Sequence, residues 1–448
     1  MTPHPRRVRL RAYKVGFGDC LLLTVTYGAA LPDGRRERHL LIDCGTMEKA
    51  DGGPRLSDIA TKVAEHCDGQ LDVVVATHRH KDHIGGFGDG RARDTLDGLN
   101  PRVVIRPWTD VPEDERDGGG LALDEEHRRF LRLLDNVPRQ AAAIGRLAFD
   151  SDRVAQRAAK LAELGFTNTK AVALLEDWGR RGRAEYVKAG TTLDLTDVLP
   201  EVGVQVLGPP TLDQVPTLTR YAKESEEYWL ALAAADDLTP LVRAGTPSSR
   251  LRAGRMLASP GGMGAAEWLL RRLDSRRISQ GLEIVEAMDD VLNNTSVILL
   301  ITVGKRRLLL PGDAQTENWS FTLDQSFGEH GRTRDDVLAA DLAKVDLYKV
   351  GHHGSRNATP RRLLRHWTKS DGSTRSVVSV LTTKKGVYEK SIEGAVPKDE
   401  LVAGLEAFGP VHDTDALPVD VWWMDLEASA RGNTGFDFTP GPPMRRVT

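Results

Sequence analysis

Short apolar stretches separated by turns fill the first ninety positions of the chain, and this pattern predicts strands. Three of them are rich in Leu, Val and Ile and are bounded by polar or Gly-containing turns, as is usual for strands. A fourth run contains three consecutive valines, which favours a strand buried on both faces. A helix is predicted over residues 56–67. The four predicted strands cover residues 8–14, 20–27, 38–45 and 71–76.

From about residue 90 the spacing of apolar residues changes to that of helices. Three segments rich in Ala, Leu, Arg and Glu predict a helical insertion over about residues 91–185. Strand patterns return at residues 192–195 and 202–207, and a second helical insertion is predicted over about residues 213–285. Four further strands are predicted at residues 296–303, 307–310, 346–350 and 376–381.

Strands that recur between helical stretches predict an α/β fold. A chain of 448 residues could hold two or three domains, but no repeat or low-complexity tract divides it. We therefore expect a single domain over residues 1–448 that is interrupted by the two insertions.

A cluster of histidines follows the predicted strand at residues 71–76. His78, His80, Asp82 and His83 lie within six positions, although the whole chain has only 12 histidines. In a turning segment the first two can face one cation and the last two a neighbouring one. Imidazole and carboxylate ligands suit zinc, manganese or iron. The cluster predicts a catalytic metal site, whereas a chance grouping on a solvated loop is the alternative.

Further polar residues follow other predicted strands. Asp313 comes directly after the strand at residues 307–310, and His352 and His353 come after the strand at residues 346–350. The chain is therefore expected to bring ligands from separate strands to one rim. The charged residues between the first histidines, Arg79 and Lys81, are interpreted as solvated spacers.

Composition restricts the possible classes of function but identifies no binding partner. A total of 61 Lys and Arg against 64 Asp and Glu gives a net charge of −3, so no overall positive charge indicates nucleic-acid binding. Three cysteines do not form an even disulfide framework and favour a reducing compartment. No signal peptide is apparent, and no apolar run approaches the roughly 20 residues that span a bilayer. We expect a cytoplasmic protein without membrane contact, from a GC-rich bacterium.

The ordered set of Asp43, the cluster at residues 78–83, Asp313 and the His352-His353 pair resembles the metallo-β-lactamase superfamily. Within it the chain is most similar to the metallo-hydrolase domain of the competence DNA-uptake (ComEC-type) group, as a standalone form. The segments that carry this resemblance are residues 15–19, 41–45, 206–210, 293–297, 311–314, 349–355 and 396–415.

The resemblance implies a four-layer αββα sandwich with two divalent metal ions, Zn or Mn, at one edge. By that resemblance His78 and His80 bind the first ion, and Asp82 and His83 bind the second. Asp313 bridges the ions, and one histidine of the His352-His353 pair completes the second site, with His353 preferred. Asp43 hydrogen-bonds a ligand imidazole and fixes its tautomer.

One departure from the superfamily concerns the first ion, for which another histidine is usual before the bridging aspartate. The only histidine between His83 and Asp313 is His127, which lies in a charged helical stretch and is interpreted as a solvated surface residue. Asn294 or water is left to fill the gap. The turn that contains Gly16, Gly18 and Asp19 is interpreted as a hairpin turn rather than a phosphate loop.

A dinuclear site predicts a hydrolase in which Asp82 and Asp313 are catalytic and a metal-activated water attacks. The resemblance favours a phosphodiesterase or nuclease, with Asn294, Ser355 and Lys349 as candidate contacts to the scissile phosphate. Nucleic acid is a candidate substrate, and the basic residues 178–183 either hold its backbone or form a solvated helix end. A small-molecule hydrolase for a lactone, thioester or cyclic dinucleotide is the first alternative. A non-catalytic scaffold is the second, with a protein partner from a defence-type gene cluster suggested by the resemblance alone.

Overall fold

The computed structural model describes residues 3–116, 123–132, 134–135, 168–215, 291–355, 357, 359–387 and 396–444. Apart from residues 129–135 and 291, these residues belong to one compact unit. Most of the second predicted insertion lies outside the described residues, as do residues 136–167 of the first.

The first sheet of this unit has eight strands in the order β15-β14-β1-β2-β3-β4-β5-β6. Pairing is antiparallel from β15 to β3 and parallel from β3 to β6, so the sheet is mixed. Its strands are β1 (Pro5–Tyr13), β2 (Cys20–Tyr27), β3 (Glu37–Cys44), β4 (Val73–Val75), β5 (Val103–Pro107), β6 (Arg183–Val187), β14 (Trp423–Ser429) and β15 (Asp437–Pro440).

The second sheet has seven strands in the order β13-β12-β11-β10-β9-β8-β7. Strands β10 to β13 are parallel, and β7 to β10 are antiparallel. They are β7 (Thr192–Leu193), β8 (Val202–Gly208), β9 (Ile298–Val303), β10 (Arg306–Leu310), β11 (Leu347–Lys349), β12 (Val378–Leu381) and β13 (Val411–Asp413).

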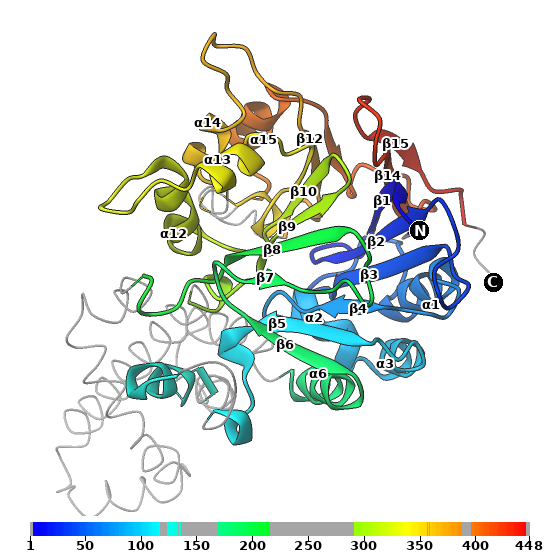
Figure 1. Cartoon of the computed structure of the whole chain (residues 1–448). Coiled ribbons are helices and arrows are strands. Elements are labelled where there is room, and N and C mark those ends of the chain that lie inside the picture. The colour runs from blue at the N-terminus through cyan, green and yellow to red at the C-terminus, as the bar shows by residue number, and fades with distance from the viewer. Residues whose placement is uncertain are drawn as a thin grey trace, which may run out of the picture. The chain divides into compact units, whose positions relative to one another are not determined.

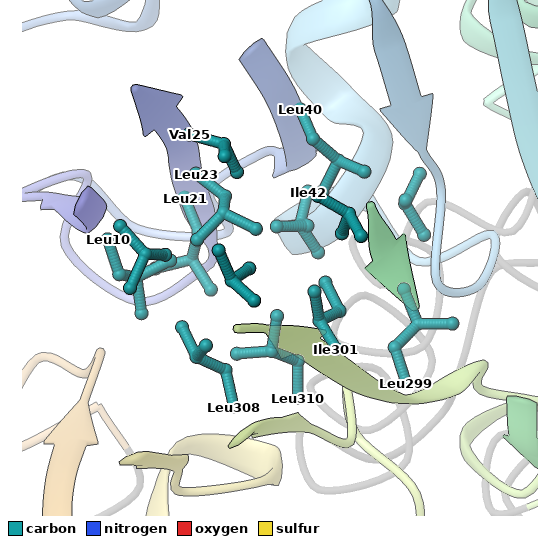
Figure 2. Close-up of a cluster of buried hydrophobic side chains, with 14 of the residues drawn as sticks. Leu10, Leu21, Leu23, Val25, Leu40, Ile42, Leu299, Ile301, Leu308 and Leu310 are labelled. Carbon is teal, nitrogen blue, oxygen red and sulfur yellow. The ribbon is translucent and has the colours of Figure 1, made fainter. Parts of the chain in front are cut away.

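The two sheets pack face to face through one hydrophobic core (Figure 2). Because side chains alternate along a strand, Leu21 and Leu23 of β2 point into this core, while Leu22 points to the other face. In β9, Leu299 and Ile301 point inward in the same way. A fully buried side chain of this size contributes about 1.5–3 kcal/mol, so the alternation fixes which face of each sheet is inside.

Helices cover the outer face of each sheet (Figure 1). The layers are therefore helix, sheet, sheet and helix, which confirms the predicted α/β class. The first sheet is covered by α1 (Leu56–His66), α2 (Lys81–Gly88), α3 (Gly90–Asp97) and α6 (Thr169–Arg181), and the second by α12 (Thr316–Phe327), α13 (Asp336–Leu342), α14 (Arg361–Arg365) and α15 (Asp399–Glu406). Short 3-10 turns occupy Trp108–Asp110, Glu113–Glu115 and His352–Gly354.

The first predicted insertion differs from the structure at both ends. Strand β5 lies inside the range 91–185 and β6 begins inside it, yet both belong to the first sheet. The five residues of β5 are all buried, and such a short strand between helical patterns gives little periodicity to detect. All three cysteines are buried and unbridged. Among the described residues, no helix is long and apolar enough to cross a membrane.

Candidate metal centre

The candidate ligands come from loops that follow strands of both sheets. His78 to His83 follow β4 and enter α2, Asp313 follows β10, and His353 follows β11. Because β10 and β11 are parallel neighbours, their carboxyl ends lie at the same edge. The amide of Val297 donates to the carbonyl of Thr77 over 2.9 Å, which joins the β4 loop to the start of β9. Both sheets thus contribute to one site.

Four buried residues form the centre of this site, and we call them the four-residue group. Asp82, His83, Asp313 and His353 each offer a ligand atom, and these atoms all lie within 4.8 Å of one another. The Nε2 of His83 is 2.9 Å from Asp313 Oδ2, and the Nε2 of His353 is 3.2 Å from Asp82 Oδ2. The Asp82 Oδ1 atom is buried without a hydrogen-bond partner among the described residues. A buried carboxylate oxygen without a donor is costly, so the group fits a metal ion.

Hydrogen bonds behind the two imidazoles fix their orientation. His83 Nδ1 lies 2.7 Å from Asp43 Oδ2, and His353 Nδ1 lies 2.7 Å from the carbonyl oxygen of Thr382. A carbonyl oxygen can only accept, so Nδ1 of His353 donates, and the Asp43 carboxylate accepts from His83 in the same way. Both rings therefore present Nε2 to the carboxylates, as metal-ligating histidines do. The predicted hydrogen bond between Asp43 and a candidate ligand imidazole is present, with His83 Nδ1 as the donor.

Backbone strain accompanies this arrangement at the histidine turn. Both His352 and His353 adopt left-handed conformations, with φ of 43° and 52°, which is costly for residues other than glycine. The turn directs the amide of His352 onto Asp313 Oδ1 over 3.0 Å. It also places the His353 ring in the four-residue group, whereas the His352 ring instead lies 2.8 Å from Ser355 Oγ through Nδ1. The geometry favours His353 over His352 as the candidate ligand.

His78 and His80, which we call the histidine pair, adjoin the four-residue group. Nε2 of His78 is 2.9 Å from Nδ1 of His80, and the ring centroids of His78 and His83 are 4.2 Å apart. Burial, followed by the charges of His83 and His80, lowers the pKa of His78 well below its usual value. The His78 imidazole is therefore neutral, which is the form that binds a metal.

Within the four-residue group, burial and the charges of neighbouring residues shift each pKa in opposite directions. Burial alone would raise the pKa of Asp82, but the hydrogen bond to His353 and the charge of His83 lower it to about 2. Burial alone would lower the pKa of His83 and of His353, but the neighbouring carboxylates, Asp313 foremost among them, together outweigh burial and raise both pKa values. Without a metal, the carboxylates are ionised and the imidazoles hold protons. A cation would take the place of those protons.

Two candidate phosphate contacts are placed away from solvent. Lys349 is buried at 1% exposure and forms an ion pair with Asp19, with Nζ 3.6 Å from Asp313 Oδ1. Its ammonium is therefore engaged by Asp19, and the expected contact from Lys349 to a scissile phosphate stays a prediction. Asn294 donates from Nδ2 to Glu317 Oε2 over 3.1 Å and accepts from the Asn318 amide. Its amide group is therefore engaged by α12 rather than by the histidine pair.

The prediction that His127 is a solvated surface residue is wrong. Its side chain is buried, Nδ1 lies 2.6 Å from Asp124 Oδ1, and the ring packs against Trp108 at 5.3 Å between centroids. Although the helical stretch around His127 is charged, the side of it that contacts Trp108 is buried. His127 groups with Asp124 and Asp213 and not with the four-residue group.

Two other charged segments differ in their outcomes. Arg79 is an ion-pair partner of the buried Asp110 at 2.6 Å, so its interpretation as a solvated spacer is wrong, whereas Lys81 is exposed. In the basic segment 178–183, Arg181 pairs with Asp97 and Arg183 lies 3.1 Å from Glu185. These pairs leave little unbalanced positive charge there.

Asp19 is the residue of this site that the sequence interpretation missed. It is buried at 1% exposure and contacts both Lys349 and Thr382. The sequence signal was an acidic residue directly ahead of the apolar strand β2, because a carboxylate in that position needs a buried partner.

Comparisons with known proteins give a short match. No family model matches the chain. Over 72 residues the chain is 33% identical to Recombination protein 2 of Haemophilus influenzae, which is 16% of this chain and 7% of the length of that protein. The match covers a small part of either protein, so membership of the metallo-β-lactamase superfamily stays a prediction.

Proposed function

We propose that the protein is a metal-dependent hydrolase of phosphodiester bonds, acting as a nuclease, on a metallo-β-lactamase sandwich of the ComEC type. The observation that carries the proposal is the four-residue group: two ionised carboxylates and two oriented imidazoles, all buried, with one carboxylate oxygen lacking a donor. Its ligand atoms suit Zn or Mn. The mixed sheets and their outer helices agree with the proposed sandwich.

Asp82, His83, Asp313 and His353 would hold one divalent ion, and the histidine pair would contribute to a second. When bound, such ions lower the pKa of a coordinated water and balance the charge that develops on a phosphate during displacement. The residues of the protein itself orient the groups that would hold these ions. Asp43 and the Thr382 carbonyl hold His83 and His353 so that Nε2 faces the site.

The two carboxylates would orient the attacking water rather than store its proton. Their pKa values lie below the usual range because, although burial opposes this, His83 and His353 favour the ionised form. A carboxylate that stays ionised near neutral pH accepts a hydrogen bond from water but is a weak base. His352, whose amide donates to Asp313, and Ser355, which contacts the His352 ring, are both half-buried, which makes them the candidates to meet the substrate.

The choice of a phosphodiester has support from the matched relative, whose name refers to recombination. Nucleic acid is the phosphodiester that such a name suggests. The described residues offer no unbalanced basic segment near positions 178–183, so we expect backbone binding to depend on the site itself.

The first experiment is metal analysis of the purified chain, followed by turnover of linear DNA, RNA, a chromogenic phosphodiester, a lactone and a lactam with added Mn²⁺ or Zn²⁺. We expect chelator-sensitive phosphodiester cleavage that Asp82→Asn lowers by at least about a thousandfold. Lys81→Ala is the matched control, because Lys81 is exposed on the same helix. Turnover of the lactone or lactam alone would contradict a nuclease, and a chain that binds no metal would point to a scaffold.

A further inference from the structure

Asp19 lies behind the four-residue group and joins elements from both sheets. It stands directly before β2, and its carboxylate accepts from Lys349 Nζ through Oδ2 and from Thr382 Oγ1 through Oδ1. Its amide donates to the carbonyl of Asp82 over 2.9 Å, and its own carbonyl accepts from Gly45 at the same distance. Both side-chain oxygens and both backbone groups are therefore engaged.

Each partner of Asp19 touches a candidate ligand. Lys349 Nζ is 3.6 Å from Asp313 Oδ1, and the Thr382 carbonyl accepts from His353 Nδ1 over 2.7 Å. The Asp19 amide holds the backbone of Asp82. His83 Nδ1 also lies 3.7 Å from Asp19 Oδ2. All four members of the group are thus connected to one carboxylate that is not itself among them.

The two oxygens of Asp313 have different surroundings. Oδ1 accepts from the His352 amide at 3.0 Å and faces Lys349, whereas Oδ2 faces Nε2 of His83 at 2.9 Å and Nε2 of His353 at 3.6 Å. Lys349 therefore lies between two carboxylates and is paired with the one outside the four-residue group. A buried cation pairs with the nearest available anion, because an uncompensated charge is costly in this environment.

We propose that Asp19 is a positioning residue that holds the Lys349 ammonium away from Asp313 and so keeps the Asp313 carboxylate available to a metal ion. This inference rests on the proposed metal centre. Without the Asp19 charge, Lys349 moves the short remaining distance to Asp313 and becomes its counter-ion. The ammonium then competes with the metal ion for the same ligand.

The test is the Mn²⁺ affinity of the full chain, measured by isothermal titration calorimetry after chelator treatment. Asp19→Asn keeps the shape of the side chain and an oxygen for Thr382 but removes the charge. We expect it to weaken Mn²⁺ binding by at least about tenfold, within the range that outer partners of ligands control. Adding Lys349→Met to the same chain removes the competing ammonium, so affinity returns to within about threefold of wild type.

The recovery in the double variant separates positioning from a structural role. If Asp19 only stabilised the fold, a second buried substitution would weaken binding further. Full affinity in Asp19→Asn, or no recovery in the double variant, would overturn the inference while leaving the metal centre in place. A wild-type chain that binds no Mn²⁺ or Zn²⁺ would overturn both.

Lys349→Met alone keeps the inference testable if Asp19→Asn does not fold. It leaves both carboxylates and removes the cation between them. We expect Mn²⁺ affinity equal to or tighter than that of wild type, together with a larger rise in the unfolding temperature on adding Mn²⁺. A tenfold weaker affinity would show that Lys349 supports the site rather than competes for it.

Discussion

The two halves of the candidate metal centre differ in charge and in support. The four-residue group has two carboxylates and two imidazoles whose Nδ1 atoms are held by Asp43 and Thr382. The histidine pair has two imidazoles in contact with each other at 2.9 Å and stands outside that group. The negative charge and the fixed imidazole tautomers of the four-residue group prepare it for a cation even when no cation is bound. We therefore expect the four-residue group to fill first and more tightly.

The largest difference in Mn²⁺ affinity between the two halves should appear when one ligand is removed from each half in turn. Asp313→Asn removes a negatively charged ligand from a buried site, and we expect a loss of roughly a thousandfold in Mn²⁺ affinity, equivalent to about 4 kcal/mol of binding free energy. His80→Asn removes one imidazole from the histidine pair, and we expect a loss of about tenfold or less. Calorimetric titration of both variants gives the comparison. Equal losses would show that the two halves bind metal as one unit.

The next difference concerns the groups that orient the imidazoles. Asp43→Asn places an amide where the carboxylate accepts from the Thr77 amide, the Thr77 hydroxyl and His83. We expect Mn²⁺ affinity to fall by about 10–100-fold. Ser355→Ala is the matched control, because Ser355 contacts His352 rather than His353. If Ser355→Ala weakens binding as much as Asp43→Asn does, His352 and not His353 is the ligand.

The sequence could predict the parts of this site that lie close together along the chain. The cluster at residues 78–83 follows a valine strand, and both features are local. The partnership of Asp19 with Lys349 spans 330 positions, so no periodicity reveals it. His352 and His353 look alike in the sequence, and only the left-handed turn assigns one of them to the four-residue group.

The same limit applies to the fold: elements with a clear local pattern could be predicted, whereas elements defined by contacts between distant segments could not. Strands β2, β3 and β9 each contain an apolar run, are buried over most of their length, and were predicted close to their observed bounds. Strand β5 was missed because its five residues lie between helices, and a short strand is recognised by its neighbours in a sheet. The burial of His127 depends on Trp108, a contact that spacing alone does not predict.

The two halves should also differ in their response to pH. Burial opposes protonation of His83 and His353, but the neighbouring carboxylates, Asp313 foremost, together outweigh it and raise their pKa values, whereas burial lowers the pKa of His78 well below the usual range. A raised folded-state pKa stabilises the metal-free protein below the unfolded value of about 6.5, and this contribution is lost as pH rises through the folded value. Metal must displace those protons, so affinity at the four-residue group should rise about tenfold from pH 6.5 to 8.

Titration in two buffers of different ionisation enthalpy counts the protons released. Release on Mn²⁺ binding should persist in His80→Asn, because the raised pKa values belong to His83 and His353. Binding without proton release, or an affinity that is flat over this range, would mean that the imidazoles of the four-residue group are already neutral.

The smallest effect should come from His127, the one histidine that lies between His83 and Asp313 in the sequence. We expect His127→Asn to change Mn²⁺ affinity by less than about twofold, because His127 contacts Asp124 and Trp108 rather than the histidine pair. The free energy of unfolding should fall by about 1–2 kcal/mol from lost packing and a lost hydrogen bond. Calorimetry and thermal unfolding separate the two effects. A loss of one bound ion per chain would make His127 the missing ligand, and the histidine pair would then be as complete as the four-residue group.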